Sequence, residues 1–245
     1  MSYLADYLIK GNLLKLKKKL KNQKMFYQVF IETTNECNRR CYYCPISKDK
    51  DYKPMRMKTE LFHRIIDELH DTNISRIVLA NYGEPLLDDR LEEFIRYIKE
   101  RMDVEIKIFS NGDFLTQERL QSLINSGIDK IRISQHRYNT VRCNFPTTNH
   151  VEYQKLRLER QGGVNVNNPY FRSRYCRNPS NTLIIRVDGK VPLCCIDYSN
   201  TVLLGNLKTQ TIGQIWNNPT NKARRRRIAR GILHDEICKK CTGLV

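Results

Sequence analysis

The sequence predicts an α/β fold in which helices pack on a parallel β-sheet. From residue 27 onward, segments with the apolar pattern of strands alternate with segments patterned as amphipathic helices, which is typical of βα units around a parallel sheet. With 245 residues, the chain can bury the core of one large domain with a small appendage. The alternation weakens after four strands, because the 40 residues of 136–175 are too few for two more units of about 30 residues each. We therefore expect a partial, TIM-type parallel barrel that stays incomplete.

The elements of this barrel follow one another in strand–helix pairs. Strands are expected at 27–33, 76–82, 104–110 and 129–135, and helices at 58–70, 89–102 and 116–127. Thr59 is expected to cap the first helix, and Gly127 to close the third. The segment 160–174 is rich in Gly, Asn and Arg, which favours a loop over the open end of the sheet.

The C-terminal part has a different character from Cys176 onward. Residues 181–195 predict a β-hairpin with Asp188 and Gly189 at its turn. Two short helices, at 211–217 and 220–230, lead to the CKKC sequence at 238–241. We therefore expect three parts, namely a basic N-terminal helical extension, the barrel, and a small domain of hairpin and helices, at 1–26, 27–170 and 171–245.

Charge and cysteine content limit the classes of function. The formal net charge is +17, with basic runs at 13–24 and 224–227. Such runs indicate either solvated helix faces or a surface for an anionic membrane, nucleic acid or an acidic carrier protein. No apolar run approaches a membrane span and no signal peptide is recognisable. We therefore expect a cytoplasmic protein whose nine cysteines stay reduced and serve as metal ligands.

Three of these cysteines, Cys37, Cys41 and Cys44, lie within eight residues directly after the first predicted strand. Clustered thiolates select zinc or iron–sulfur centres over hard cations. A structural zinc site closes with four ligands, but this loop contains no histidine to complete the set. Three thiolates on a four-iron cluster leave one iron open, which is a catalytic arrangement. The position at a strand's carboxyl end is where barrel enzymes place their chemistry.

The CNRRCYYCP sequence, with Tyr43 before the last cysteine, resembles the cluster loop of the radical S-adenosylmethionine (SAM) superfamily. The resemblance covers residues 28–242, nearly the whole chain. It implies a [4Fe–4S] cluster whose open iron is occupied by the amine and carboxylate of SAM. In that family an electron from the cluster cleaves SAM, and the 5′-deoxyadenosyl radical then abstracts a hydrogen atom from the substrate. A flavodoxin or ferredoxin is the reducing partner that the resemblance implies.

Motifs at the ends of the next three strands extend the resemblance. NYGEPLL at 81–87 resembles the family's Gly-Gly-Glu motif, with Tyr82 in place of the first glycine. The resemblance implies that Gly83 and Glu84 hold the methionyl ammonium of SAM. It implies further polar contacts to SAM from residues at the third and fourth strand ends: Ser110, Asn111, Ser134 and Gln135. Taken singly, Asn-Gly is an ordinary turn, and His136 is read as a structural histidine.

Four cysteines in the C-terminal part form a second constellation: Cys176, Cys194, Cys238 and Cys241. A zinc knuckle with four cysteine ligands is one interpretation of them. Beside the radical SAM loop, their spacing resembles the twitch domain, a short relative of the SPASM domain that binds one auxiliary [4Fe–4S] cluster. Of the remaining thiols, Cys143 is expected to pack as a small apolar side chain, and Cys195 directly follows a predicted ligand.

Three functions compete at this point. The resemblance favours oxidation of a secondary alcohol of an aminocyclitol or sugar to a ketone, with Arg160, Glu32 and Asp197 as candidate bases or substrate contacts. A second hypothesis is radical epimerisation of a sugar or ribosomal peptide, with Cys195 as the hydrogen-atom donor. A third is a non-catalytic module that binds zinc or nucleic acid. Nucleic acid is not the expected partner, because phosphate binding gives no reason for the strand-end motifs.

Overall fold

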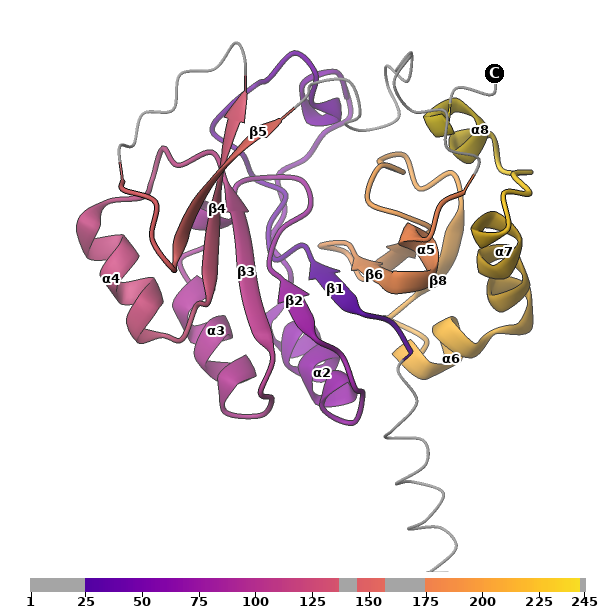
Figure 1. Cartoon of the computed structure of the whole chain (residues 1–245), viewed down its shortest axis with the longest axis horizontal. Coiled ribbons are helices and arrows are strands. Elements are labelled where there is room, and N and C mark those ends of the chain that lie inside the picture. Colours follow the sequence, from indigo (N-terminus) through magenta and orange to yellow (C-terminus); the bar gives the residue numbers. More distant parts are fainter. Residues whose placement is uncertain (1–24, 137–144, 157–174, 243–245) are drawn as a thin grey trace, which may run out of the picture.

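A six-stranded, entirely parallel sheet forms the body of the protein (Figure 1). The computed structural model describes residues 25–136, 145–156 and 175–242. In spatial order the strands run β5-β4-β3-β2-β1-β6. Their bounds are β1 (Gln28–Ile31), β2 (Arg76–Val78), β3 (Glu105–Ser110), β4 (Lys130–His136), β5 (Val151–Leu156) and β6 (Thr182–Ile185). The expected parallel α/β fold is confirmed.

Three helices lie on one side of this sheet (Figure 1), namely α2 (Thr59–His70), α3 (Leu91–Lys99) and α4 (Gln117–Asn125). Strand side chains alternate between two faces. On β3, Ile106 and Ile108 are fully buried in the core that the helices cover. Glu105 and Lys107 occupy the alternate positions and form an ion pair with each other at 3.3 Å. One face of the sheet is therefore the apolar core, and the other carries polar side chains.

The helix ends agree with the sequence expectation in one case and differ in another. Gly127 adopts φ +98° directly after α4, a conformation that L side chains rarely adopt, so its prediction as a helix terminator is confirmed. Thr59 was expected as an N-cap, but Lys58 holds that position without a side-chain bond. The hydroxyl of Thr59 instead accepts a hydrogen bond from Arg90 Nη1 at 3.0 Å. That cap prediction is wrong because the side chain is used in a tertiary contact.

Residues 181–195 do not form the expected hairpin ladder. The turn exists, since Gly189 has φ +83° and the Arg186 N–H donates to Lys190 O at 2.9 Å. The segment before the turn, however, is β6, which pairs in parallel with β1. The segment after it, β7 (Lys190–Pro192), pairs antiparallel with β8 (Leu203–Asn206). The turn therefore carries the chain from the large sheet into a separate two-stranded sheet.

Short helices complete the C-terminal part and bracket the cysteine loops. They are α5 (Asn178–Asn181), α6 (Ile212–Asn217), α7 (Pro219–Ala229) and α8 (Glu236–Thr242), with 3-10 turns η1 (Pro45–Ser47) and η2 (Pro85–Leu87) in the barrel part. Predictions that concern residues 1–24, Cys143 and Arg160 lie outside the described residues. The fold thus places two groups of cysteines, one after β1 and one around β7 and α8.

Candidate active site

A cavity of about 340 Å³ opens at the carboxyl ends of the central strands. All three cysteines of the first loop line it, and so do residues from three successive strand ends: Gly83, Glu84, Ser110, Asn111 and Ser134. The carboxyl ends of parallel strands meet at one edge of the sheet, which is why segments distant in sequence converge here. The cavity therefore unites most of the residues that the sequence motifs had singled out.

The thiols of this loop lie close enough to influence one another. Burial raises the pKa of Cys37 to about 11, and the neighbouring Cys44 and Cys41 add to the effect. Burial is also the main cause of the raised pKa of Cys44. Since metals and clusters bind thiolates, ligation here must displace the protons of these thiols. Tyr43, also in the lining, is largely buried beside the same thiols.

The loop is fixed to the third strand end by a set of polar side chains, of which only Asn111 was expected at the site from the sequence. Arg39 forms a bidentate pair with Asp113, through Nε to Oδ2 at 2.7 Å and Nη2 to Oδ1 at 2.5 Å. Asn38 Nδ2 donates to the same carboxylate at 2.7 Å, and Asn38 Oδ1 accepts from Asn111 Nδ2 at 2.9 Å. Bidentate pairs are geometrically demanding, so they hold the cysteine loop over the cavity.

Gly83 lets the second strand end pack directly on the start of the cysteine loop. It adopts φ +84°, and a Cβ at this position would lie 2.7 Å from both Asn35 C and Thr34 O. The next residue extends the contact, because the Glu84 N–H donates to Glu36 O at 2.6 Å. Only glycine fits both the backbone conformation and the space.

The Glu84 carboxylate points back to the third strand end and is 2% exposed. It accepts hydrogen bonds from Ser110 Oγ at 2.8 Å, Asn111 N at 2.7 Å and Leu86 N at 3.1 Å. Burial nevertheless raises the pKa of Glu84 to about 7. In the described part of the chain no lysine or arginine forms an ion pair with this carboxylate. A ligand ammonium is the kind of group that would complete it.

The fourth and fifth strands contribute a slightly different set of residues from the one expected. Ser134 lines the cavity, but Gln135 does not. Successive side chains of a strand point to opposite faces, so only one of these neighbours can face the cavity. Arg132, two residues before Ser134, and Gln154 on β5 line it instead. Arg132 Nε also donates to Glu152 Oε1 at 2.6 Å.

The four C-terminal cysteines are gathered as well. Burial raises the pKa of Cys238 to about 12, with contributions from Asp235, Cys176 and Cys241. Cys238 in turn contributes to the raised pKa of the buried Cys194. Among the residues that the structure describes, no three His, Cys, Asp or Glu side chains converge on one metal ion. Thiolates gathered in this way suit either zinc or an iron–sulfur cluster.

Comparison with known families agrees with both groups of cysteines. Residues 31–160 match the radical SAM superfamily, and residues 176–242 match the iron–sulfur cluster-binding SPASM domain. The chain belongs to the radical SAM superfamily. Members of this superfamily use SAM together with an iron–sulfur cluster, and the cavity described above has the residues for both.

Several radical SAM relatives resemble the chain closely enough to compare. The S-adenosyl-L-methionine-dependent 2-deoxy-scyllo-inosamine dehydrogenase of Niallia circulans is 30% identical over 90% of this chain and 94% of its own length. The crystal structure of BtrN in complex with AdoMet and 2-DOIA matches with a TM-score of 0.75 and 31% identity, covering 85% of this chain and 89% of BtrN. GTP 3′,8-cyclase of Aquifex aeolicus is 33% identical over only 44% of this chain and 35% of its own length.

Of the candidate catalytic residues, Glu32 directly follows β1 and does not line the cavity at the strand ends. It is 1% exposed. Its carboxylate accepts from Tyr82 N at 3.1 Å and Val187 N at 3.0 Å, and Arg186 Nη1 lies 3.4 Å away. These contacts connect the ends of three strands, so the geometry favours a positioning function over contact with substrate.

Asp197 and Cys195 lie in the loop after β7. The Asp197 carboxylate accepts from Thr201 N and Oγ1, both at 2.8 Å, and from Val202 N at 2.9 Å. It therefore shapes the loop that carries Cys194. Cys195 is half-buried, and Asn178 Nδ2 lies 3.8 Å from its sulfur. Neither residue lines the radical SAM cavity.

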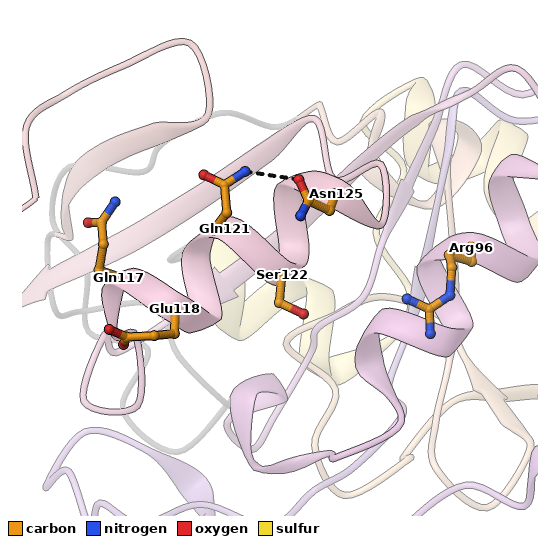
Figure 2. Close-up of a pocket in the computed structure, with 6 residues that line it drawn as sticks. All are labelled: Arg96, Gln117, Glu118, Gln121, Ser122 and Asn125. Carbon is orange, nitrogen blue, oxygen red and sulfur yellow. Dashed lines mark hydrogen bonds between the residues drawn. The ribbon is translucent and has the colours of Figure 1, made fainter.

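A second cavity lies away from the sequence motifs. A cavity of about 560 Å³ on the outer face of α4 is lined by polar side chains, with Arg96 reaching it from α3 (Figure 2). None of the residues that line it belongs to a sequence motif.

The arginine run at 224–227 contributes to the fold. Arg225 is buried, lies 3.7 Å over the Trp216 ring and donates to Trp216 O at 2.6 Å. Arg224 and Arg227 both pair with Asp235, so most of this run serves the fold.

None of the helices in the described part of the chain combines the length and apolar character needed to cross a bilayer.

Proposed function

We propose that the protein is a radical SAM dehydrogenase that carries two [4Fe–4S] clusters and oxidises a secondary alcohol of an aminocyclitol or sugar to a ketone. One observation carries the proposal: a chain with both groups of cysteines aligns over nearly its whole length with a SAM-dependent 2-deoxy-scyllo-inosamine dehydrogenase. The substrate class comes from that relative's activity. The thiol chemistry also supports work in the cytoplasm, where thiols stay reduced.

Each cluster has its own proposed set of ligands. Cys37, Cys41 and Cys44 would hold the first, and the four C-terminal cysteines the auxiliary one. When bound, the clusters and SAM supply an electron, a deoxyadenosyl radical that takes one hydrogen atom, and an acceptor for the second electron of the oxidation. A flavodoxin or ferredoxin is the proposed source of the first electron.

The residues around the cavity are proposed to bind and orient SAM. Glu84 is proposed to pair with the methionyl ammonium, since its buried carboxylate is held in place by Ser110 and Asn111. Gly83 allows the approach of the two strand-end loops, and Tyr43 excludes water from the loop's inner side. Ser134 is proposed as a further polar contact, while Gln135 is not retained.

The hydroxyl group of the substrate must also lose a proton for a ketone to form. Of the three candidate bases, the carboxylates of Glu32 and Asp197 are each engaged by protein donors. Arg160 lies outside the described residues and remains a proposed substrate contact.

Epimerisation is the second candidate function, and Cys195 is the observation that favours it. Its thiol directly follows the proposed ligand Cys194 and is half-buried. A thiol in that position can return a hydrogen atom to a carbon radical, whereas a dehydrogenase has no use for such a donor. A sugar or a ribosomal peptide is the substrate class for this alternative.

One experiment separates these functions. Anaerobically reconstituted protein is first assayed for iron, with about eight irons per chain expected for two four-iron clusters. It is then incubated in heavy water with SAM, a reductant and candidate aminocyclitols, sugars and peptides, and the products are analysed by mass spectrometry. Loss of two hydrogens supports the dehydrogenase, and uptake of solvent deuterium without loss of mass supports the epimerase. A colourless protein with stoichiometric zinc would refute both.

A further inference from the structure

Three side chains connect the cavity at the strand ends, called the SAM cavity below, with the loop that carries Cys194. They are Tyr82, Arg186 and Tyr198, which we call the aromatic joint. The guanidinium of Arg186 lies 4.5 Å from the centre of the Tyr82 ring and 5.4 Å from that of Tyr198. The two rings meet edge to face at 4.9 Å. Cation–π contacts of this kind strengthen when they are desolvated, and both Tyr82 and Arg186 are only 8% exposed.

Each member of the aromatic joint is connected to a different part of the site. The Tyr82 hydroxyl donates to Cys195 O at 2.8 Å. The Tyr198 hydroxyl donates to Asp49 Oδ2 at 2.6 Å, just after the first cysteine loop. Arg186 Nη1 lies 3.4 Å from Glu32 Oε1, at the end of β1. The joint therefore connects the loop of the first cysteines to the loop of the auxiliary cysteines.

Tyr82 contacts both the SAM cavity and the loop of the auxiliary cysteines. Tyr82 is among the residues that line the SAM cavity, and its hydroxyl donates to the backbone of the residue that follows Cys194. Its own backbone N–H donates to Glu32 Oε1 at 3.1 Å. It stands directly before Gly83 and Glu84, where the usual motif has a glycine. A glycine could make none of the side-chain contacts, so the departure from the motif has a structural consequence.

We propose that Tyr82 is a positioning residue that holds the Cys194–Cys195 turn in a fixed place relative to the SAM cavity. One hydrogen bond to the Cys195 carbonyl fixes the peptide next to a ligand of the proposed auxiliary cluster. The stacked Arg186 keeps the Tyr82 ring from rotating away from that carbonyl. The inference rests on the proposed auxiliary cluster but not on the identity of the substrate.

The test compares Tyr82→Phe with the wild-type chain, both anaerobically reconstituted at full length. Tyr97→Phe is the matched control, since it removes a hydroxyl bonded to Asp67 Oδ1 at 3.0 Å on the outer helix layer. The reduced proteins are followed by electron paramagnetic resonance (EPR) during exposure to an iron chelator. The cluster signal that SAM shifts reports the first cluster, and the signal that SAM leaves unchanged reports the auxiliary cluster.

We expect the SAM-insensitive signal of Tyr82→Phe to have altered g-values and to decay about fivefold faster, the effect of one neutral hydrogen bond on local opening. The SAM-sensitive signal should be unchanged, and Tyr97→Phe should match the wild type in both. Arg186→Lys, which keeps the charge but loses the planar stacking surface, should change the auxiliary signal in the same direction.

Two results would overturn the inference. The first is a Tyr82→Phe protein whose auxiliary signal and decay match the wild type. The second is equal acceleration for both clusters, which indicates general loosening of the fold. If the wild type itself lacks a SAM-insensitive signal, the proposed auxiliary cluster fails, and the inference fails with it. That outcome is distinguishable because it is visible before any variant is made.

Discussion

Replacing Gly83 with alanine should damage the site more than its single added methyl group suggests. The new Cβ would lie 2.7 Å from Asn35 C and from Thr34 O, both of them backbone atoms. The residue would also have to keep φ +84°, which costs a non-glycine residue about 1–2 kcal/mol. Relief of a contact with backbone costs a further ~1–3 kcal/mol. We therefore expect Gly83→Ala to destabilise the protein by about 2–5 kcal/mol.

The same strain should weaken SAM binding. The Glu84 N–H donates to Glu36 O at 2.6 Å and holds the second strand end against the cysteine loop. Relief of the contact must therefore break this bond and separate the two segments. The assays are urea unfolding and SAM binding by calorimetry on the reconstituted protein. Gly213→Ala is the control, since its nearest heavy atom would be 3.9 Å away and it lies in α6, where alanine is favoured over glycine. A Gly83→Ala protein within ~0.5 kcal/mol of the wild type and with unchanged SAM affinity would refute the reasoning.

Three further predictions concern the clusters, pH and the arginine run. Replacing the three cysteines of the first loop with alanine should halve the iron content and abolish 5′-deoxyadenosine formation while the auxiliary cluster remains, as iron analysis and Mössbauer spectra can check. Burial raises the pKa of Glu84 to about 7, and the methionyl ammonium of SAM favours the charged form of this carboxylate. SAM affinity should therefore fall as the pH drops below 7. The Glu84→Gln variant should bind SAM weakly and without that pH dependence. Arg225→Ala should lower the free energy of unfolding by ~2–3 kcal/mol, because a buried contact to Trp216 is lost. The control Arg226→Ala, at an exposed position, should leave the unfolding midpoint unchanged.

Much of the site could be predicted because parallel strands end at the same edge. The order of the motifs along the chain was enough to bring Cys37, Glu84, Ser110 and Ser134 together. Gln135 was included in that set although strand periodicity already assigns it to the other face. The expectation treated Ser134 and Gln135 as a unit and did not apply the alternation of the strand.

Other features depend on partners too distant in sequence to predict. Arg39 and Asp113 are 74 residues apart, and nothing local marks them as a pair. The strand β5 was not predicted, because half of the residues of Val151–Leu156 are polar and the strand is stabilised by pairing with β4 along its whole length. The turn at Gly189 was correctly recognised, but a turn signal does not say which sheet receives the strand before it.

The pairing of β6 with β1 limits how the enzyme can be divided. A boundary at residue 171 assigns β6 to the C-terminal domain, yet four of its residues form a parallel ladder with Gln28–Ile31. An isolated fragment 171–245 would carry an unpaired apolar strand, which is prone to aggregation, and the remaining barrel would lose its edge. Exchange of the auxiliary-cluster region between relatives should therefore succeed only with a junction after Ile185. The barrel then keeps all six strands together with Cys176, and only the loops that carry the other three cysteines of this group are transferred.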